Sequence, residues 1–210
     1  MFAKRRSVVF GAAALAVSLL TACNGGGGGA ISGDDMTLGV ENAPITLIEY
    51  ASATCPHCAT FHEEAFEQLK TNYIDTGRVR YVFREYPTAP APVAVAAFQL
   101  ARCGGASEEQ YFARLGEIFR QQQAMFASGS MEGVRNKLIE IGNAAGLTTE
   151  QVTQCISDEA GAERIRRIVD QGNREFSISG TPTFIINGEK VEGIGNYETL
   201  SRALEAASAN

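Results

Sequence analysis

The sequence lacks a second pair of closely spaced cysteines, and its only histidines are His57 and His62. A structural zinc site usually takes about four ligands from two such pairs, so half of that ligand set is missing. The chain also lacks an excess of positive charge, since its formal net charge is −6, which argues against a nucleic-acid partner. The apolar stretch Val8–Leu20 is shorter than the about 20 residues of a membrane-spanning helix. What remains is one globular domain, with or without a large insertion.

The pair that is present lies in Cys55-Pro56-His57-Cys58, between an apolar run at Ile45–Ala51 and an amphipathic pattern. Backbone N–H groups in the first turn of a helix lack partners and carry a partial positive charge, so they stabilise a thiolate. With Cys55 as N-cap and Pro56 at the first helical position, the sulfur faces these groups. This predicts a Cys55 pKa below about 8.5, with protonated His57 adding to the effect. Cys58 is then the resolving thiol.

Thiol–disulfide redox chemistry is therefore the favoured interpretation of this pair. A zinc half-site and an inert disulfide are the alternatives. His62, one turn beyond Cys58, is expected on the helix surface, because the sequence shows no metal-ligand cluster around it.

The start of the chain predicts export. Three basic residues at positions 4–6 precede Val8–Leu20, as in a signal peptide. The following Leu-Thr-Ala-Cys ends at Cys23 and resembles a bacterial lipobox, in which the cysteine is acylated. We therefore expect a signal peptide at 1–22, a lipid anchor on Cys23 and a glycine-rich tether over 23–35. Ordinary secretory cleavage with a free Cys23 is the alternative.

Five cysteines in an exported protein leave one over unless one is chemically occupied. Lipid on Cys23 leaves four, and Cys55 with Cys58 accounts for two of these. Cys103 and Cys155 are then expected to form a structural disulfide, which an oxidising compartment permits. Two buried free thiols are the alternative.

The hydrophobic pattern predicts the order strand, helix, strand, helical block, hairpin and helix. The expected segments are strands at 36–40, 45–51 and 79–86, a helix over 55–73, helices from 91 to 176, a hairpin over 183–194 and a last helix at 197–207. This order predicts an α/β, thioredoxin-like fold with a large helical insertion. Its first part is expected at 36–88, the insertion at 89–170 and the second part at 171–210.

Within this order, Cys55-Pro56-His57-Cys58, the helical block and a Thr181-Pro182 pair before a strand resemble the DsbA-like thiol:disulfide oxidoreductases. The resemblance covers about residues 36–207. It implies that the Thr181-Pro182 bond is cis and lies against the active-site cysteines, where it pairs with an extended substrate. A trans proline that starts an edge strand is the alternative.

Glu49, six residues before Cys55 in the apolar strand, resembles the buried acid of related oxidoreductases. The resemblance implies that it helps to move protons at Cys58, because burial raises the pKa of a carboxyl group and suits it to accept a proton. A solvated residue on the outer face of the strand is the alternative.

Taken together, these features predict a disulfide oxidase of the periplasm, anchored to a membrane as a lipoprotein, that acts on unfolded or reduced exported proteins. No cofactor or metal is expected, because the cysteines carry the electrons. The resemblance implies reoxidation by a membrane quinone-linked partner of the DsbB type. A monomer is expected, since only a short tether precedes the catalytic frame where dimeric isomerases carry a dimerisation domain.

Two other functions stay open. Threonine before the proline, here Thr181, also occurs in relatives that isomerise or reduce disulfides, so an isomerase or reductase of the cell envelope is the first alternative. A metal-binding envelope lipoprotein that uses Cys55, Cys58 and His62 is an alternative of another class.

Overall fold

The computed structural model describes residue 1 and residues 29–209, so the expected signal peptide and the lipid anchor at Cys23 lie outside the described residues. One five-stranded sheet has the order β1-β3-β2-β4-β5. Its strands are β1 (Met36–Leu38), β2 (Ile45–Ala51), β3 (Val79–Glu85), β4 (Thr183–Ile186) and β5 (Glu189–Val191). Strands β2 and β3 are parallel, and the other neighbouring pairs are antiparallel.

The helices are α1 (Pro56–Glu64), α2 (Phe66–Leu69), the π-helical turn η1 (Lys70–Ile74), α3 (Ala91–Arg102), α4 (Glu108–Arg120), α5 (Gln122–Phe126), α6 (Met131–Ala144), α7 (Thr149–Cys155), α8 (Glu159–Phe176) and α9 (Tyr197–Ser208). The single helix expected over 55–73 is thus divided at Ala65, which has φ −117°. The break and the wide turn of η1 leave Leu69, Tyr73 and Ile74 buried against the core.

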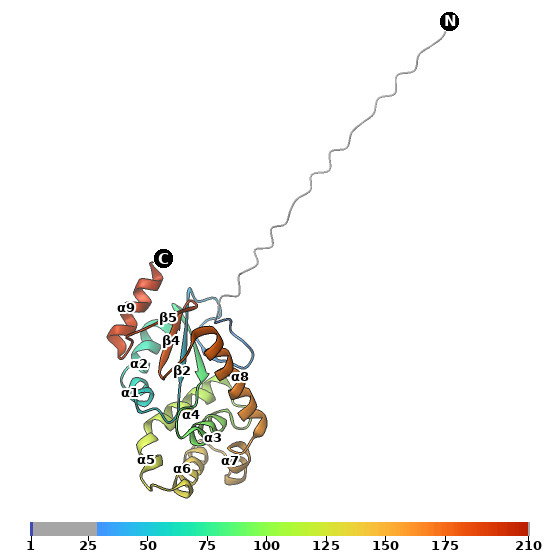
Figure 1. The fold of residues 1–210 in the computed structure, drawn as a ribbon, viewed down its shortest axis with the longest axis vertical. Coiled ribbons are helices and arrows are strands. Elements are labelled where there is room, and N and C mark those ends of the chain that lie inside the picture. Colours follow the sequence, from blue (N-terminus) through green and yellow to red (C-terminus); the bar gives the residue numbers. More distant parts are fainter. Residues whose placement is uncertain (2–28, 210) are drawn as a thin grey trace.

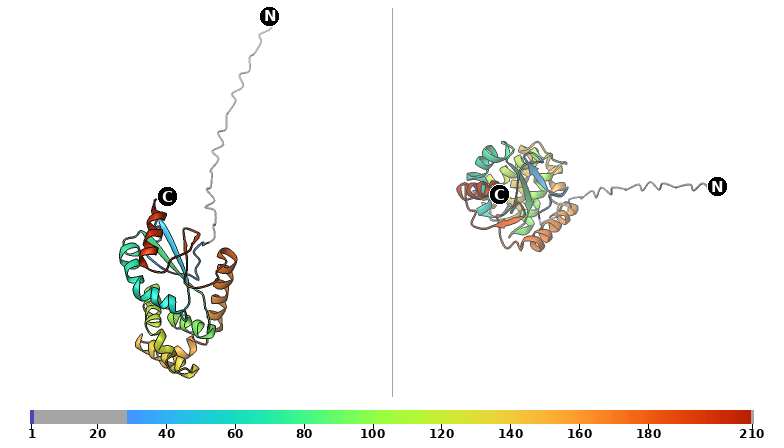
Figure 2. Two further views of the ribbon diagram at one scale, coloured as in Figure 1. Left: turned by 60° about the vertical axis from the view of Figure 1, so that its left-hand side comes forward. Right: turned by 90° about the horizontal axis from the view of Figure 1, so that it is seen from above.

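The two faces of the sheet bury different sets of side chains. Successive residues of a strand point to opposite faces, so Leu47 joins the large cluster that contains α1, α2 and α9, whereas Ile48 and Tyr50 join a smaller cluster with Phe176 of α8. In Figure 2 the sheet stands between α8 on one side and α1, α2 and α9 on the other. The order of layers is therefore helix, sheet, helix, as a thioredoxin-like frame requires.

Helices α3 to α7 form a block at one end of the sheet (Figure 1). Helix α4 packs against both α1 and α3, which joins the block to the frame. Helix α8 starts in the block and returns along the sheet, so the insertion boundary expected at residue 170 falls within one continuous helix. The fold is thus α/β and thioredoxin-like with a large helical insertion, as the sequence predicts.

A buried ion pair lies on the α8 side of the sheet. Arg84 donates from Nε to Oδ1 of Asp35 at 2.9 Å and from Nη1 to the Tyr50 hydroxyl at 2.7 Å. Both charged side chains are 1% exposed. Fixing Asp35 against β3 ties the segment before β1 to the sheet.

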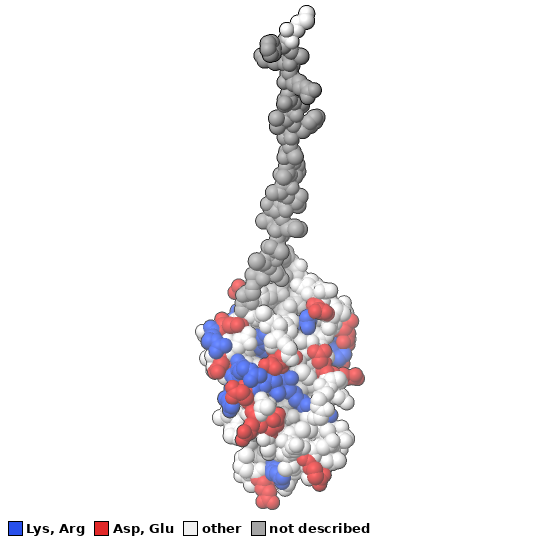
Figure 3. Space-filling view, turned by 90° about the vertical axis from the view of Figure 1, so that its right-hand side faces the viewer, with Lys and Arg blue, Asp and Glu red and all other residues white. Residues whose placement is uncertain are grey.

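Charges of both signs are interleaved on the outer face that carries α8, with basic side chains gathered near its middle and acidic ones around them (Figure 3). Ion pairs such as Arg167 with Asp34 at 3.2 Å and Arg166 with Glu163 contribute to this pattern. Among the described residues, no helix is both long enough and apolar enough to cross a membrane.

Candidate active site

The site begins where β2 ends and α1 starts. Cys55 is the N-cap of α1 with an extended backbone, and Pro56 follows in the first turn. The Cys55 Sγ accepts a hydrogen bond from the Cys58 N–H at 3.4 Å. The sulfur therefore occupies the place that the free N–H groups of a helix N-terminus offer to an anion.

The surroundings of Cys55 stabilise its thiolate. Hydrogen bonding with the Cys58 side chain is the largest cause, opposed by burial, and Thr181 and the N–H groups of Cys58 and His57 add to it. Together they lower the pKa of Cys55 to about 5. When the sulfur is protonated, its S–H can instead donate to the Thr181 carbonyl at 3.2 Å.

Cys58 has the opposite environment. Its side chain is fully buried, and its Sγ accepts only a long hydrogen bond from the Ser52 N–H at 3.5 Å. Burial is the largest cause that raises the pKa of Cys58, followed by its hydrogen bond to Cys55 and the charge of Glu49. One thiol of the pair is thus ionised at neutral pH, while the other is held protonated.

The Thr181–Pro182 loop lies against this pair. Its peptide bond is cis, both residues are half-buried, and the Thr181 carbonyl reaches Cys55 Sγ. Strand β4 begins at the next residue. The structure therefore brings together two segments that are 126 residues apart in the chain. A second cis bond, Ala89–Pro90, had no signal in the sequence analysis.

Glu49 lies behind the cysteines and is fully buried, unlike the solvated residue of the alternative interpretation. Its Oε2 accepts a hydrogen bond from the Tyr81 hydroxyl at 2.6 Å, and its Oε1 lies 3.2 Å from His62 Nε2. The carboxylate also raises the pKa of Tyr81, after the larger effect of burial. Glu49, Tyr81 and His62 thus form one buried polar cluster next to Cys58.

The expectation that His62 lies on the helix surface is wrong. Its side chain is only 5% exposed and is stacked between Phe66 and Phe119, with ring centroids at 4.8 and 4.2 Å. The reason is the packing of α4 against α1, which covers this face of the helix. The helical periodicity around Cys58 cannot show that α4, which lies more than 40 residues later in the chain, packs against this helix.

His57, by contrast, is exposed beside Cys55. Its backbone N–H contributes to the low pKa of Cys55. The electrostatic role of its imidazole ring remains a prediction.

Gln122 of α5 belongs to the site although no feature of the sequence indicates it. Its side-chain amide donates to the carbonyls of Ala53 at 2.9 Å and Cys55 at 3.1 Å, which fastens the helical block to the loop before α1. No local pattern marks this glutamine, because its partners are 67 and 69 residues away.

Cys103 and Cys155 are joined by a disulfide with a Cα–Cα distance of 5.5 Å. They lie at the ends of α3 and α7, within the helical block. Cys55 and Cys58 are both free thiols in this structure. In the described part of the chain, no group of three or more His, Cys, Asp and Glu side chains is placed to hold a metal ion.

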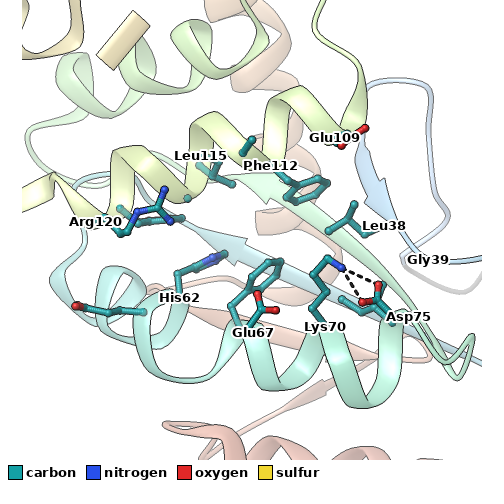
Figure 4. A pocket seen from close by; sticks show the side chains of 16 residues that line it. Leu38, Gly39, His62, Glu67, Lys70, Asp75, Glu109, Phe112, Leu115 and Arg120 are labelled. Carbon is teal, nitrogen blue, oxygen red and sulfur yellow. Dashed lines mark hydrogen bonds and ion pairs between the residues drawn. The ribbon is translucent and has the colours of Figure 1, made fainter. Parts of the chain in front are cut away.

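A groove of about 690 Å³ opens between α1, α2 and η1 on one side and α4 on the other. In Figure 4, His62 extends from α1 into this groove towards α4. Apolar side chains such as Phe112 and Leu115 line it, and charged side chains such as Glu67 and Arg120 also border it.

Comparisons with known proteins agree with this geometry. The family model described as thioredoxin matches residues 32–206. A candidate protein-disulfide oxidoreductase of Rickettsia typhi is 33% identical over 177 residues, which is 84% of this chain and 63% of that protein. The chain thus spans slightly less than two thirds of the length of this curated relative.

Solved structures give the same result. The crystal structure of alpha-DsbA1 of Wolbachia pipientis has a TM-score of 0.75 and 26% identity, over 85% of this chain and 93% of that one. BdbD from Bacillus subtilis has a TM-score of 0.71 and 18% identity, over 84% and 94%, and it supports the fold alone. The matched family model, the shared fold and the Cys55–Cys58 pair at the start of α1 lead to one conclusion: this chain belongs to the thioredoxin family, as a DsbA-like thioredoxin-fold protein.

Proposed function

We propose that the protein is a thiol:disulfide oxidoreductase that introduces disulfide bonds into exported proteins. The observation that carries this proposal is the contrast between Cys55, whose pKa is lowered to about 5, and Cys58, whose pKa is raised by burial. A stabilised Cys55 thiolate favours the reduced pair, and this makes the disulfide a stronger oxidant.

In the proposed reaction, a client thiolate attacks Sγ of Cys55 in the oxidised pair. The Cys55–Cys58 bond breaks, its electron pair goes to Cys58, and that sulfur takes up a proton. A second client thiolate then attacks the client sulfur of the mixed disulfide. The client disulfide forms, and Cys55 leaves as a thiolate, which its low pKa favours.

Client binding is assigned to the Thr181–Pro182 loop and the surface around Cys55. Backbone groups of an extended client can pair with the half-buried backbone of this loop, and this recognition is largely independent of the client sequence. Unfolded or reduced proteins fit this mode because their backbone is available for pairing.

The cellular setting is part of the same proposal. Export through residues 1–22, acylation of Cys23 and a tether that ends before Asp35, which Arg84 fixes to the sheet, would hold a monomer at a membrane of the periplasm. Reoxidation there would use a membrane quinone-linked partner of the DsbB type. Thr181 before the proline leaves isomerase or reductase activity as the rival outcome of the test.

The test uses the protein with Cys23→Ser, so that no thiol other than those of the Cys55–Cys58 and Cys103–Cys155 pairs can take part in exchange. The oxidised protein is mixed in equimolar amount with reduced, unfolded ribonuclease A, and client disulfides are counted by mass after alkylation. An oxidase is expected to transfer one disulfide per molecule within the experiment. Cys58→Ser, which cannot form the Cys55–Cys58 disulfide, is expected to transfer none. Failure to oxidise the reduced client, together with rescue of scrambled ribonuclease by the reduced protein, would turn the assignment to an isomerase.

A further inference from the structure

The proposed reaction requires Cys58 to gain and lose a proton, but its side chain is fully buried. Its Sγ contacts the Ser52 N–H and the Cys55 thiol. An amide N–H cannot accept a proton, and the Cys55 sulfur is held in the mixed disulfide during resolution. The proton therefore needs a path through neighbouring side chains. Cys58 and His62 lie one turn apart on the same face of α1, and His62 lies 3.2 Å from Glu49. This carboxylate, whose charge also acts on Cys58, is therefore the first candidate on such a path.

Glu49 is also fully buried, so it cannot exchange protons with solvent directly. One of its oxygens accepts from the Tyr81 hydroxyl, which is itself fully buried. The other oxygen lies 3.2 Å from Nε2 of His62. Of these two contacts, His62 is the one that reaches towards the protein surface.

His62 is held in a fixed orientation at the edge of the groove. Phe66 and Phe119 stack on its two faces, and Phe61 and Phe83 contact its ring edge-on. The side chain lines the groove between α1 and α4 (Figure 4). Among the described residues, none forms a hydrogen bond with its other ring nitrogen, Nδ1. One ring nitrogen is thus bound to Glu49, while the other is free to bind water in the groove.

We propose that His62 transfers protons between Glu49 and water in the groove, and so sets how fast Cys58 can be deprotonated and reprotonated. This inference rests on the proposed function and adds a residue and an exit route to it. His62 acts through Glu49, so it is a positioning residue for the reaction. Imidazole suits this role because it accepts and releases protons near neutral pH.

The relay operates when oxidised glutathione closes the Cys55–Cys58 pair. The Cys55 thiolate first displaces one glutathione thiolate and forms a mixed disulfide. Cys58 then gives its proton to Glu49, and its sulfur forms the bond to Cys55 while the second glutathione leaves with the electron pair. The proton passes from Glu49 to His62 Nε2, as Nδ1 releases one to water. The dithiol is oxidised and glutathione disulfide is reduced.

Several charged and titratable groups surround this route and shape its pH dependence. On the buried side, Glu49 comes from β2, Tyr81 from β3 and Cys58 from α1. On the groove side, the charged residues come from α1, α2, η1, α4 and the turn after η1: Glu63, Glu67, Lys70, Asp75, Glu109 and Arg120. Lys70 and Asp75 pair with each other at 2.7 Å.

The experiment measures both steps separately in the full chain with Cys23→Ser. Reduced protein is mixed with oxidised glutathione, quenched with acid and analysed by mass from pH 5 to pH 9. Formation of the mixed disulfide depends on glutathione concentration, whereas its resolution by Cys58 does not. His62→Ala is compared with the wild type and with Glu67→Gln, a control that removes an exposed carboxylate at the same groove.

We expect His62→Ala to slow resolution at pH 7 by about ten-fold, below the roughly 10²–10⁴-fold typical of direct acid–base groups because water partly replaces the ring. The rate of mixed-disulfide formation in His62→Ala should equal that of the wild type. Both rates should also be unchanged in the Glu67→Gln control. Imidazole added to His62→Ala should restore resolution, because the vacated space opens to the groove. Pyrazole, a ring of the same size that is a far weaker base, should not.

Resolution at the wild-type rate in His62→Ala would overturn the inference, as would equal rescue by both rings, which would indicate packing alone. If His62→Ala does not fold, His62→Gln is measured in its place. Glutamine can keep a hydrogen bond to Glu49 but cannot relay a proton, so it should slow resolution and flatten its pH profile, and an unchanged profile would refute the relay. Absence of any mixed disulfide in the wild type would instead overturn the proposed function, and the inference with it.

Discussion

Two buried clusters on opposite faces of the sheet contain the same kinds of group but have different surroundings. Asp35, Tyr50 and Arg84 join a carboxylate, a phenol and a cation on the α8 side. Glu49, Tyr81 and His62 join a carboxylate, a phenol and an imidazole on the α1 side. Glu49 and Tyr50 are neighbours on β2, so the alternation of the strand separates the two clusters.

The difference lies in the basic group and in what surrounds it. Arg84 stays protonated at any ordinary pH, and its pair with Asp35 is sealed from solvent. In the proposed relay His62 passes on a proton: it borders a groove and contacts Glu49, whose charge acts on Cys58. The first cluster is therefore suited to hold the fold together, and the second to serve the thiol pair.

Breaking the ion pair of the first cluster should have one of the two largest effects on stability. Asp35→Asn leaves the buried Arg84 charge unpaired, which costs about 3–5 kcal/mol. Urea unfolding should show this loss, while the pH profile of glutathione exchange at Cys55 stays as in the wild type. A changed profile would contradict the separation of the two clusters.

The disulfide of the helical block provides a matched control for stability. Cys103→Ala with Cys155→Ala opens a loop with a sequence separation of 52 residues, and the chain-entropy model gives a loss of about 4 kcal/mol. We expect the free energy of unfolding to fall by a similar amount as in Asp35→Asn. The kinetics of glutathione exchange should again be unchanged. Slower exchange in this variant would show that lost stability alone affects the site.

The next effect depends on pH and concerns Cys55. Its pKa is lowered from the ordinary value of about 8.5 to about 5 in the folded, reduced protein. The resulting stabilisation is complete above about pH 8.5 and is lost as the pH falls towards 5. Thermal unfolding should therefore show the reduced protein gaining stability over the oxidised protein as the pH rises through this window. A pH-independent difference would contradict the stabilised thiolate.

Glu49→Gln tests the second cluster directly. Removing the carboxylate charge should lower the pKa of Cys58, because that charge raises it. Resolution of the mixed disulfide should nevertheless slow, since the proton acceptor is gone. Titration of the Cys58 Cβ signal by NMR and acid-quench kinetics check the two effects, and unchanged kinetics would leave Glu49 with a structural role only.

The smallest effects come from the two phenols. Tyr50→Phe and Tyr81→Phe each remove one hydrogen bond to a charged group, at a cost of about 1.5–3 kcal/mol or less. Their unfolding free energies should change by similar amounts, but only Tyr81→Phe should alter the pH profile of resolution, because Tyr81 bonds Glu49. Equal pH profiles of resolution in the two variants would contradict the conclusion that only the Glu49 cluster serves the thiol pair.

The parts of the site that could be predicted from the sequence depend on short-range physics. The N-cap position of Cys55 follows from four consecutive residues, and the alternating and helical patterns predict the strands and the helical block. The place of Thr181 beside Cys55 was implied by the family resemblance and not by any pattern in the chain.

The parts that could not be predicted depend on contacts between distant segments. His62 meets Glu49 across 13 residues and Tyr81 meets Glu49 across 32, once α4 has covered α1. Gln122 reaches Cys55 from the helical block across 67 residues. Hydrophobic periodicity describes one element at a time, so it cannot show which polar side chains two packed elements bring together.

The redox equilibrium of Cys55 and Cys58 with glutathione is the most direct test of the stabilised Cys55 thiolate. The measurement uses the protein with Cys23→Ser at pH 7 and follows the oxidised fraction by mass after alkylation. We predict a potential well above the about −270 mV of thioredoxin, towards the oxidising end of the scale near −120 mV. A value at or below about −270 mV would contradict the assignment of an oxidising pair and favour a reductase.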